Sequence, residues 1–488
     1  MLRGRYQASL EFLTTYGWAI AIVILVLAIL FSTGIFSFSS SIPNSISGFS
    51  STPVSSVAAN PTALEMDVGN NVGQPINITG IVVNSSGHSY SSFSCQNNYI
   101  YPGQSTICYV SGSFSNPAYI SAEIIYYIAT SKKIYLSSTG SIVVSLSKVL
   151  VPVGVKYYVP ITIKNTQTSP TPNPFQQMIN ISSSSTPWAY INTSQSSYFG
   201  QNVEFFYSNG EAIPSWLEQY HSGYAIWWIK IGNIPSSSSI TVYMGFASKT
   251  TNLFNTNDVG EAPQLSSTYG QYDDGANVFN FYDNFAGTSL NTNKWTVDSS
   301  GTTATYSVSN GLTLTATSTG STANYMILHS SATFGENSIV EAYSSSIESP
   351  IGGVRSYSPG FSSSSSETGI FDQSNALNLA FSAGRNGYVT WMVGQGDSSA
   401  MSYYGTSMTT PSPGILGVYY TGSTNYFYEG YTQIFSSSTD TPTGSVYASL
   451  GIWAESSSST FNTYTTWIRV RAYPPNGVMP SVTFGSVS

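Results

Sequence analysis

The chain has 488 residues, enough for several domains that each bury an apolar core. Only 7% of the residues are charged, whereas 41% are hydrophobic and 14% are aromatic, which favours folded β structure over disorder. The formal net charge is −8, and no basic patch is present to follow a phosphate backbone, which argues against nucleic acid as a partner. A surface of hydroxyls and amides changes its charge little with pH and is compatible with an acidic habitat.

The N-terminus predicts a membrane helix over residues 7–38. Arg3 and Arg5 precede it, and from Tyr16 the chain is almost continuously apolar. About twenty such residues span a bilayer as a helix, and the preceding arginines favour a cytoplasmic N-terminus. We therefore expect a single-pass protein of the cell membrane with its C-terminal bulk outside the cell, or a subunit of a surface filament.

The hexapeptide QASLEF, which begins at Gln7, resembles the archaeal class III signal peptide of type IV pilin-like proteins. The resemblance implies a leader peptide at residues 1–6, cut between Tyr6 and Gln7, although the family usually has glycine before the cut. It also implies that Glu11 pairs with the new α-ammonium of a neighbouring pilin-like subunit in the membrane. The alternative is a plain membrane anchor in which Glu11 reaches the lipid surface.

The next segments predict a stalk and a small domain. Residues 39–62 are rich in Ser, Pro, Gly and Asn, which is typical of a stalk. In residues 63–147, short apolar runs alternate with turn residues and predict a small β-sandwich. Cys95 and Cys108 are the only cysteines, and on the outer side of a membrane we expect them to form a disulfide. Closing so short a loop contributes about 3 kcal/mol.

Four asparagines begin Asn-x-Ser/Thr sequences in the part expected outside the cell, and such sequences accept N-linked glycans. These glycosylation candidates are Asn77, Asn84, Asn180 and Asn192.

Residues 150–282 predict a second β domain, which opens on the alternating strand VKYYVPITIKN. Its Asn-Gly turn, the Pro214-x-Trp216-x-Glu218 stretch, a Trp-rich strand, an Ile-Pro-Ser turn and a Tyr-x-Gly ending at Gly245 resemble domain of unknown function 2341. That domain occurs in archaeal and bacterial surface proteins ahead of concanavalin A-like domains. The resemblance implies no activity.

The tryptophans of this domain have two interpretations. Trp216, Trp227 and Trp228 could form a surface on which sugars stack, but buried tryptophans carry a large apolar area, and we expect them in the core. We expect Glu218 to accept hydrogen bonds from backbone or Trp N–H groups, with a catalytic role as the alternative.

Residues 283–488 predict a two-sheet jelly roll, because strand patterns repeat with Gly/Ser turns and no helical period appears. The opening FYDNFAGTSLNTNKW and the closing WIRVRAYPP resemble the ends of a concanavalin A-like, laminin-G-like module. The expected fold class is therefore mainly β, with an N-terminal transmembrane, pilin-like helix followed by tandem β-sandwich domains.

The carboxylates predict no reaction centre. Glu336 and Glu341 lie five residues apart, on opposite faces of a regular strand, whereas a glycosidase needs two carboxylates that flank one bond. Asp273, Asp274 or Asp283 could bind calcium, but acidic turn residues commonly stabilise turns. We therefore expect no cofactor, with calcium as the alternative.

The remaining catalytic signals are also missing. His88, His221 and His329 are isolated and lack zinc-ligand spacing, which predicts surface or packing roles. The sequence holds no phosphate-binding glycine loop, nucleophile elbow or Cys-x-x-Cys pair. We therefore expect no enzymatic activity.

These patterns together favour a membrane-anchored archaeal surface protein whose β domains serve adhesion, binding glycans or other envelope components. Aromatic side chains of the jelly roll would stack on sugar rings. The candidates are Trp391, Trp453 and Tyr473. Two alternatives remain open: a structural subunit of a pilus or cell envelope, and an extracellular glycoside hydrolase.

Overall fold

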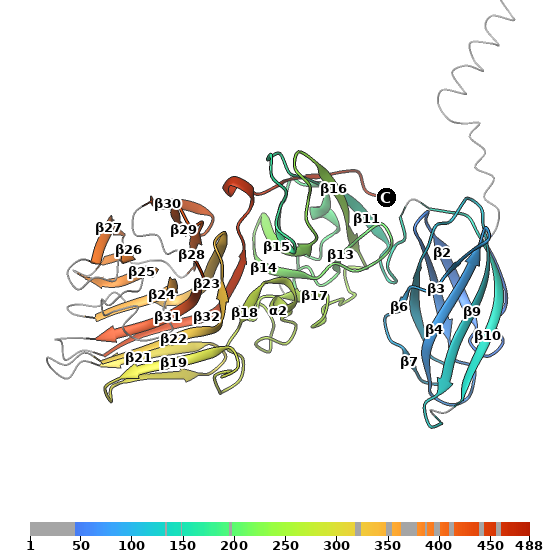
Figure 1. Ribbon diagram of the computed structural model, residues 1–488, viewed down its shortest axis with the longest axis horizontal. Helices are drawn as coiled ribbons and strands as arrows, with labels where there is room; N and C mark the ends of the chain where they lie inside the picture. Colours follow the sequence, from blue (N-terminus) through green and yellow to red (C-terminus); the bar gives the residue numbers. More distant parts are fainter. Residues whose placement is uncertain are drawn as a thin grey trace, which may run out of the picture. The chain divides into compact units, whose positions relative to one another are not determined.

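The computed structural model describes residues 44–131, 134–147, 149–194, 198–317, 324–347, 354–362, 378–385, 388–394, 401–408, 414–438, 444–454 and 460–488. The chain divides into two compact units, residues 1–150 and 151–488 (Figure 1). The leader, the membrane helix and the residues Tyr6, Gln7 and Glu11 lie outside the described ranges. Across those ranges, no helix is both long enough and apolar enough to cross a membrane.

Unit 1 is an antiparallel β-sandwich, as the sequence predicted (Figure 1). Sheet A has the order β1 (Ser45–Gly48), β10 (Tyr135–Val144), β9 (Ala118–Ile128), β4 (Ile76–Ser85) and β5 (His88–Tyr90), with β7 (Tyr99–Ile100) also on β4. Sheet B has the order β2 (Val54–Ala59), β3 (Ala63–Gly69), β8 (Ser105–Ser111) and β6 (Phe93–Cys95). Alternate side chains of β9 and β4 point into one core between the sheets.

The prediction of a stalk at residues 39–62 is wrong, because the first two strands lie within that range. Both β1 and β2 lie within that range, and Val54 and Ala59 of β2 are buried in the core of unit 1. The serines between them face outward, so the segment is Ser-rich although it belongs to a sheet.

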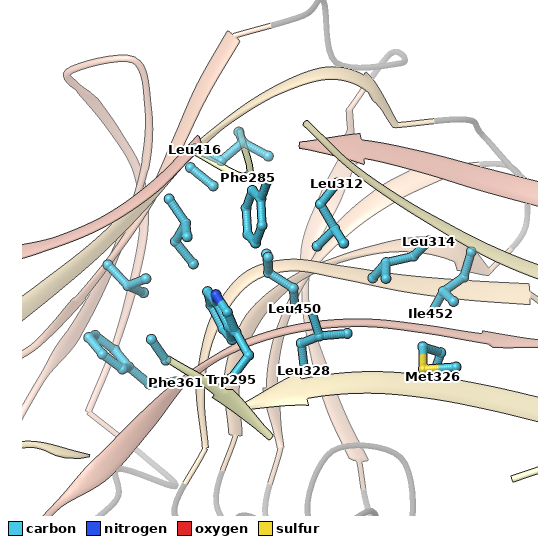
Figure 2. Close-up of a cluster of buried hydrophobic side chains, with 14 of the residues drawn as sticks. Phe285, Trp295, Leu312, Leu314, Met326, Leu328, Phe361, Leu416, Leu450 and Ile452 are labelled. Carbon is cyan, nitrogen blue, oxygen red and sulfur yellow. The ribbon is translucent and has the colours of Figure 1, made fainter. Parts of the chain in front are cut away.

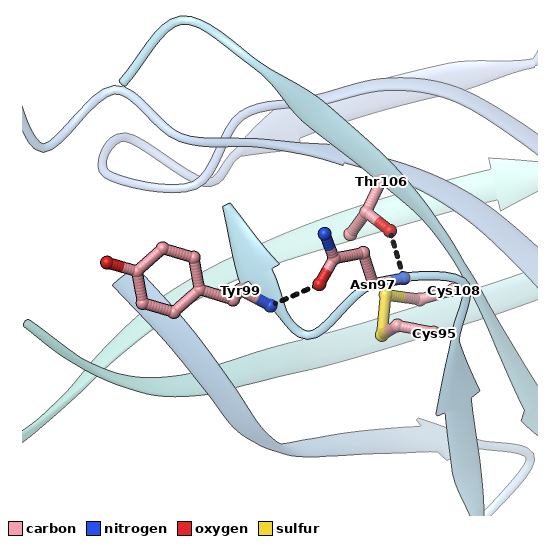
Figure 3. The surroundings of a disulfide bond; sticks show 5 residues. All are labelled: Cys95, Asn97, Tyr99, Thr106 and Cys108. Atoms are coloured by element: carbon pink, nitrogen blue, oxygen red, sulfur yellow. Dashed lines mark hydrogen bonds between the residues drawn. A yellow bond between two sulfur atoms is a disulfide. The ribbon is translucent and has the colours of Figure 1, made fainter. Parts of the chain in front are cut away.

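The predicted disulfide is confirmed. Cys95 on β6 and Cys108 on β8 are register partners in sheet B, with Cα atoms 4.0 Å apart (Figure 3). The bridge closes a loop that contains β7 and the turn at Pro102 and Gly103.

Unit 2 begins with a second sandwich (Figure 1). Sheet C has the order β13 (Val203–Phe206), β16 (Ser239–Phe246), β11 (Tyr157–Lys164) and β33 (Ser481–Phe484). Sheet D has the order β12 (Phe175–Ser182), β15 (Tyr224–Ile231), β14 (Ser215–His221) and β17 (Val259–Glu261). Short helical turns are η1 (Thr186–Tyr190), α2 (Gly275–Val278) and η3 (Pro475–Gly477).

The third sandwich has its own pair of sheets. Sheet E has the order β20 (Ala304–Val308), β21 (Leu312–Thr317), β32 (Thr460–Ala472), β23 (Ser338–Ile347), β28 (Gly414–Tyr420), β29 (Asn425–Glu429) and β30 (Thr432–Ser437), with β18 (Phe281–Asp283) also on β32. Sheet F has the order β19 (Trp295–Ser300), β22 (Asn324–Phe334), β31 (Val446–Ala454), β24 (Val354–Ser362), β25 (Asn378–Arg385), β26 (Tyr388–Gly394) and β27 (Met401–Met408). Figure 2 shows the core between them, where Trp295 lies among leucine and phenylalanine side chains and stacks on Phe285.

Sheet D is buried on both faces. Along β15, Ala225, Trp227 and Ile229 pack into the core shared with sheet C. The alternate residues Ile226 and Trp228 pack in a separate cluster with residues of sheet E. This explains why β15 is almost continuously apolar, since a strand covered on both sides needs no polar face.

The prediction that the jelly roll extends to residue 488 is wrong, because the last strand belongs to the second sandwich. After β32 the chain turns at Pro474 and Pro475, and β33 pairs with β11 of sheet C. Val482 and Phe484 then pack against the core of the second sandwich. Residues 283–488 therefore contain the third sandwich plus one strand of the second. The boundary at 282 also falls inside β18, which belongs to sheet E.

Candidate functional site

A buried ionic cluster joins sheet D to sheet E. Along β32, Ile468 and Val470 point into the core of the third sandwich, so Arg469 and Arg471 point the other way, toward sheet D. Both arginines are almost completely buried, and apolar side chains surround them. Buried charges of this kind require close partners.

Two glutamates supply those partners. Arg469 Nη2 lies 2.7 Å from Glu218 Oε2 of β14, and Arg469 Nε lies 2.7 Å from Glu341 Oε2 of β23. Arg471 Nη2 lies 2.6 Å from Glu341 Oε1. Tyr431 donates to Glu218 Oε1 at 2.6 Å. The four charges balance, and the pair Glu218–Arg469 connects the second sandwich to the third.

The glutamates of this cluster are closed to any substrate. Burial alone would raise the pKa of Glu341, but Arg469 and Arg471 lower that pKa to about 2. Glu336 is exposed and precedes β23, so the two glutamates do not lie on one strand as the sequence spacing predicted.

The predicted roles of the tryptophans and of Glu218 are confirmed. Trp227 lies in the core of the second sandwich, and Trp216 and Trp228 lie between sheets D and E. Trp228 Nε1 donates to Glu218 Oε2 at 2.8 Å. The Arg469 guanidinium carbon lies 4.7 Å from the centre of the Trp228 ring, within the range of a cation–π contact.

An open groove of about 560 Å³ lies beside this cluster. One wall comes from the loop between β11 and β12, and the other comes from the turns that flank β23, β29 and the end of β32. The lining residues that the structure describes carry no charge. They are Ser169, Pro170, Pro172, Asn337, Thr421, Ser423, Tyr426, Tyr473, Pro474, Pro475 and Asn476.

The tyrosines of the groove are anchored on the ionic cluster. Arg471 Nη2 donates to the Tyr419 hydroxyl at 2.8 Å, and the Tyr419 ring stacks on Tyr428 with centroids 4.0 Å apart. Tyr419 also meets the Tyr473 ring edge to face at 6.0 Å. The Tyr473 and Tyr426 rings lie 13° from parallel, 6.4 Å apart. A chain of contacts therefore positions the half-buried groove tyrosines.

Two further contacts fix the groove. Asn476 Nδ2 donates to Gln167 Oε1 at 3.0 Å and links the two walls, and the Tyr473 backbone N–H donates to Asn337 O at 2.8 Å. Burial raises the pKa of Tyr473 to about 12, with Tyr426 and Tyr428 adding to the shift, so its hydroxyl keeps its proton at neutral pH. The groove thus offers aromatic rings, amides and hydroxyls, the groups that recognise neutral sugars.

The three predicted ligand-binding residues differ in how the structure places them. Tyr473 lines the groove. Trp391 and Trp453 belong to β26 and β31, but their side chains lie outside the described part of the chain. Sequence reasoning missed Tyr426, although the alternation NYFYE in β29 places Tyr426 and Tyr428 on one face.

The glycosylation candidates lie in different environments. Asn84 and Asn180 are exposed, and Asn77 is half-buried on β4. Asn192 is only 5% exposed, and its Nδ2 donates to Tyr198 O at 3.2 Å. A glycan on Asn192 would therefore require the fold to open.

Of the three aspartates considered as calcium ligands, Asp273 and Asp283 accept hydrogen bonds from protein groups, whereas the Asp274 carboxylate does not. Asp273 accepts from Trp216, Gly275, Tyr282 and Asn284. Asp283 accepts from Trp295 Nε1 at 2.6 Å. Among the described residues, neither carboxylate oxygen of the buried Asp274 has a hydrogen-bond partner, and burial raises the pKa of Asp274 well above the usual range.

The next residues to consider are the possible metal ligands, including the three histidines. Where the chain is described, no cluster of three or more His, Cys, Asp or Glu side chains is placed to hold a metal ion. His88 and His221 are exposed, whereas His329 is fully buried on β22.

Comparison with known proteins identifies one family segment. Residues 199–262 match the family model described as Domain of unknown function (DUF2341). This agrees with the resemblance seen in the sequence, and it covers the strands that carry Glu218 and Trp228.

A sequence relative comes from Sulfolobus islandicus rod-shaped virus 1. This "Uncharacterized protein 562" is 29% identical over 355 residues, which is 66% of this chain. The chain spans 58% of the viral protein's length.

Several solved structures are similar in fold. A pseudo beta-1,3-glucanase of Mycobacterium tuberculosis is 14% identical and covers 40% of this chain and 98% of its own, with a TM-score of 0.32. The Bacillus licheniformis beta-glucanase is 13% identical and covers 39% of this chain and 97% of its own, with a TM-score of 0.29. An endo-acting O-glycanase of the human gut microbiota is 12% identical over 40% of this chain and 99% of its own, with a TM-score of 0.31.

The expectation that the protein has no enzymatic activity is corrected by this comparison. The similar solved structures named above are described as a pseudo beta-1,3-glucanase, a beta-glucanase and an endo-acting O-glycanase, whereas the sequence analysis expected no enzyme. The likeness is one of fold, and no residue role is transferred from it.

Proposed function

We propose that the protein is displayed on a cell surface and binds a neutral glycan in the groove lined by Tyr426 and Tyr473. The observation that carries the proposal is a groove with an uncharged lining in which two nearly parallel tyrosine rings lie beside amide and hydroxyl groups. Tyrosine rings present an apolar face to a sugar ring, while Asn337 and Asn476 offer donors and acceptors to its hydroxyls.

The binding experiment uses the soluble chain from residue 39 to 488 on an array of neutral and acidic glycans. We expect binding to neutral glycans, and Tyr473→Ala should weaken it about tenfold because one stacking contact is lost. Tyr306→Ala is the matched control, since Tyr306 is 40% exposed on β20 and does not line the groove. Release of sugar from bound glycans is measured in the same samples. Silence across neutral glycans would contradict the proposal.

The proposed anchor is the apolar segment at residues 7–38, which the sequence supports. Only the five residues 39–43 separate it from Asn44, which immediately precedes β1. Protease added to intact cells should therefore remove the β domains and leave a short membrane fragment. Recovery of the intact chain in the cytosol would contradict this anchor.

Filament assembly is a second candidate, favoured by the QASLEF motif. Replacing Glu11 with Gln removes the charge that would pair with a neighbouring subunit. Loss of filament incorporation in Glu11→Gln would support assembly, and unchanged surface display with intact glycan binding would support a lone anchored protein.

A further inference from the structure

A row of side chains crosses sheet A of unit 1. Tyr99 of β7 and Tyr127 of β9 are both register partners of Asn77 on β4, and Tyr135 of β10 is the register partner of Tyr127. Residues directly opposite in neighbouring strands point to the same face of a sheet. The outer face therefore carries, in order across four strands, a tyrosine, an asparagine and two more tyrosines.

Asn77 forms the floor of a slot between two of these tyrosines. Neighbouring strands lie about 4.7–4.9 Å apart, so the backbones of Tyr99 and Tyr127 are separated by about 10 Å. The asparagine side chain is much shorter than a tyrosine, and side chains stand roughly perpendicular to a sheet. One sugar ring with a carbon contact of about 3.5–4.0 Å on each side fits this width.

Each wall of the slot is supported by a second tyrosine. The Tyr99 and Tyr101 rings meet edge to face with centroids 5.3 Å apart, and the Tyr127 and Tyr135 rings do so at 6.1 Å. Tyr101 is 55% exposed and Tyr135 is 66% exposed, so the surface stays open to solvent.

The Tyr99 wall is also fixed through the backbone. Its N–H donates to Asn97 Oδ1 at 2.9 Å, and the Cys95–Cys108 disulfide closes the loop from which it projects (Figure 3). The next residue, Ile100, is buried in the core of unit 1. The disulfide thus helps to hold one side of the slot.

We propose that Asn77 carries an N-linked glycan and that its first sugar lies in the slot between Tyr99 and Tyr127. Asn77 begins the sequence Asn-Ile-Thr, and it is half-buried on the outer face of β4, between the buried residues Ile76 and Ile78. In the attachment, Nδ2 bonds to the anomeric carbon of a lipid-phosphate-linked oligosaccharide. The carbon–oxygen bond to phosphate breaks, the phosphate keeps the electron pair, and Nδ2 loses one proton.

The other three sequences lack this arrangement. Asn84 lies on the same strand, but its register partners are Ser89 and Ser121. Asn180 lies opposite Ile226 on an edge strand, and Asn192 is buried. The slot lies in unit 1 and does not involve the groove of unit 2.

The test compares the full chain produced in an N-glycosylating archaeal host with the same chain from a bacterium that lacks N-glycosylation. Mass spectrometry of glycopeptides should find Asn77 occupied in the first sample. Asn77→Gln should lower the Tm of unit 1 by about 4 °C or more in the glycosylated protein, because the stacked sugar is lost. The same substitution should leave the Tm of the bacterial protein unchanged.

Two further variants complete the experiment. In the glycosylated protein, Tyr127→Ala should leave Asn77 occupied but abolish the effect of Asn77→Gln on the Tm, and Asn84→Gln should leave the Tm unchanged. An unmodified Asn77 in the archaeal sample would overturn the proposal. So would an Asn77→Gln effect of equal size in both hosts, since that effect could not come from a glycan.

Discussion

Two groups of aromatic side chains in unit 2 lie next to each other but differ in what they contact. Trp216, Trp228 and Trp467 are completely buried between sheets D and E and enclose Arg469. Tyr426 and Tyr473 are half-buried and line an open groove. Arg471 and Tyr419 connect the two groups.

The difference teaches that aromatic content alone does not mark a binding surface. The tryptophans occupy positions where a strand is covered on both faces, so they stabilise the junction of two sandwiches. The tyrosines occupy turns and strand ends, where the chain leaves a concave surface open. Substitutions in the first group should therefore change stability, and substitutions in the second group should change binding.

The largest effect should come from Arg469→Met. This change leaves Glu218 and Glu341 without their shared cation in a buried cluster, which costs about 3–5 kcal/mol of unfolding free energy. Urea unfolding followed by tryptophan fluorescence measures the loss. Lys164→Met is the control, because Lys164 is exposed on β11. Equal stability of the two variants would show that the cluster does not hold the sandwiches together.

A smaller loss is expected for Trp228→Phe. The phenylalanine keeps most of the apolar area but leaves Glu218 Oε2 without the indole N–H, at a cost of about 1–3 kcal/mol. Chemical unfolding measures this cost, and glycan binding by the folded variant should equal that of the unchanged protein. If the variant is as stable as the unchanged protein but binds glycan more weakly, Trp228 belongs to the binding site, and the distinction between stabilising tryptophans and binding tyrosines is wrong.

The pH dependence of stability should differ between glutamates that are paired with arginines and glutamates that have no cationic partner. The pKa of Glu341 is lowered to about 2, so its contribution is complete above the unfolded value of 4.5 and is lost as the pH falls toward 2. Burial raises the pKa of Glu261 and of Glu204 to about 7. The folded state therefore retains protons that the unfolded state releases, and stability falls as the pH rises from 4.5 to about 7.

Thermal unfolding of the soluble chain should thus show the highest Tm near pH 4.5. Glu261→Gln should flatten the decline toward pH 7, whereas Glu211→Gln should not, because Glu211 is exposed. A Tm that rises steadily up to neutral pH would contradict the assignment of neutral buried carboxyls.

The smallest change in stability is expected for Tyr426→Ala. Tyr426 is half-buried at the groove, so the unfolding free energy should change by about 0.5 kcal/mol. Glycan affinity should fall several-fold, as measured by calorimetry. A large loss of stability would instead make the groove tyrosines part of the core.

The sequence predicted the sandwiches because strand alternation is a local property. The alternating apolar residues of β9 and the continuous apolar run of β15 each identify a strand without knowledge of its partners. The disulfide could also be predicted from the sequence, since Cys95 and Cys108 are the only two cysteines. The strands β1 and β2 were missed because their outward residues are serines, whose frequency is also typical of stalks.

The ionic cluster and the groove could not be predicted from local sequence patterns. Glu218 and Arg469 are distant in sequence, and only the packing of sheet D on sheet E brings them together. One local signal was present: Arg469 and Arg471 alternate with Ile468 and Val470, so two cations share a face of an otherwise apolar strand. The groove depends on turns from both sandwiches, and turn positions follow from tertiary structure.

The central claim, that the groove of unit 2 binds a neutral glycan, is tested most directly by hydrogen–deuterium exchange on the chain from residue 39 to 488. The account predicts that a saturating neutral glycan slows exchange in residues 421–426 and 473–476, and that Tyr473→Ala removes this protection. Protection confined to other segments of the chain, with these two unchanged, would contradict it.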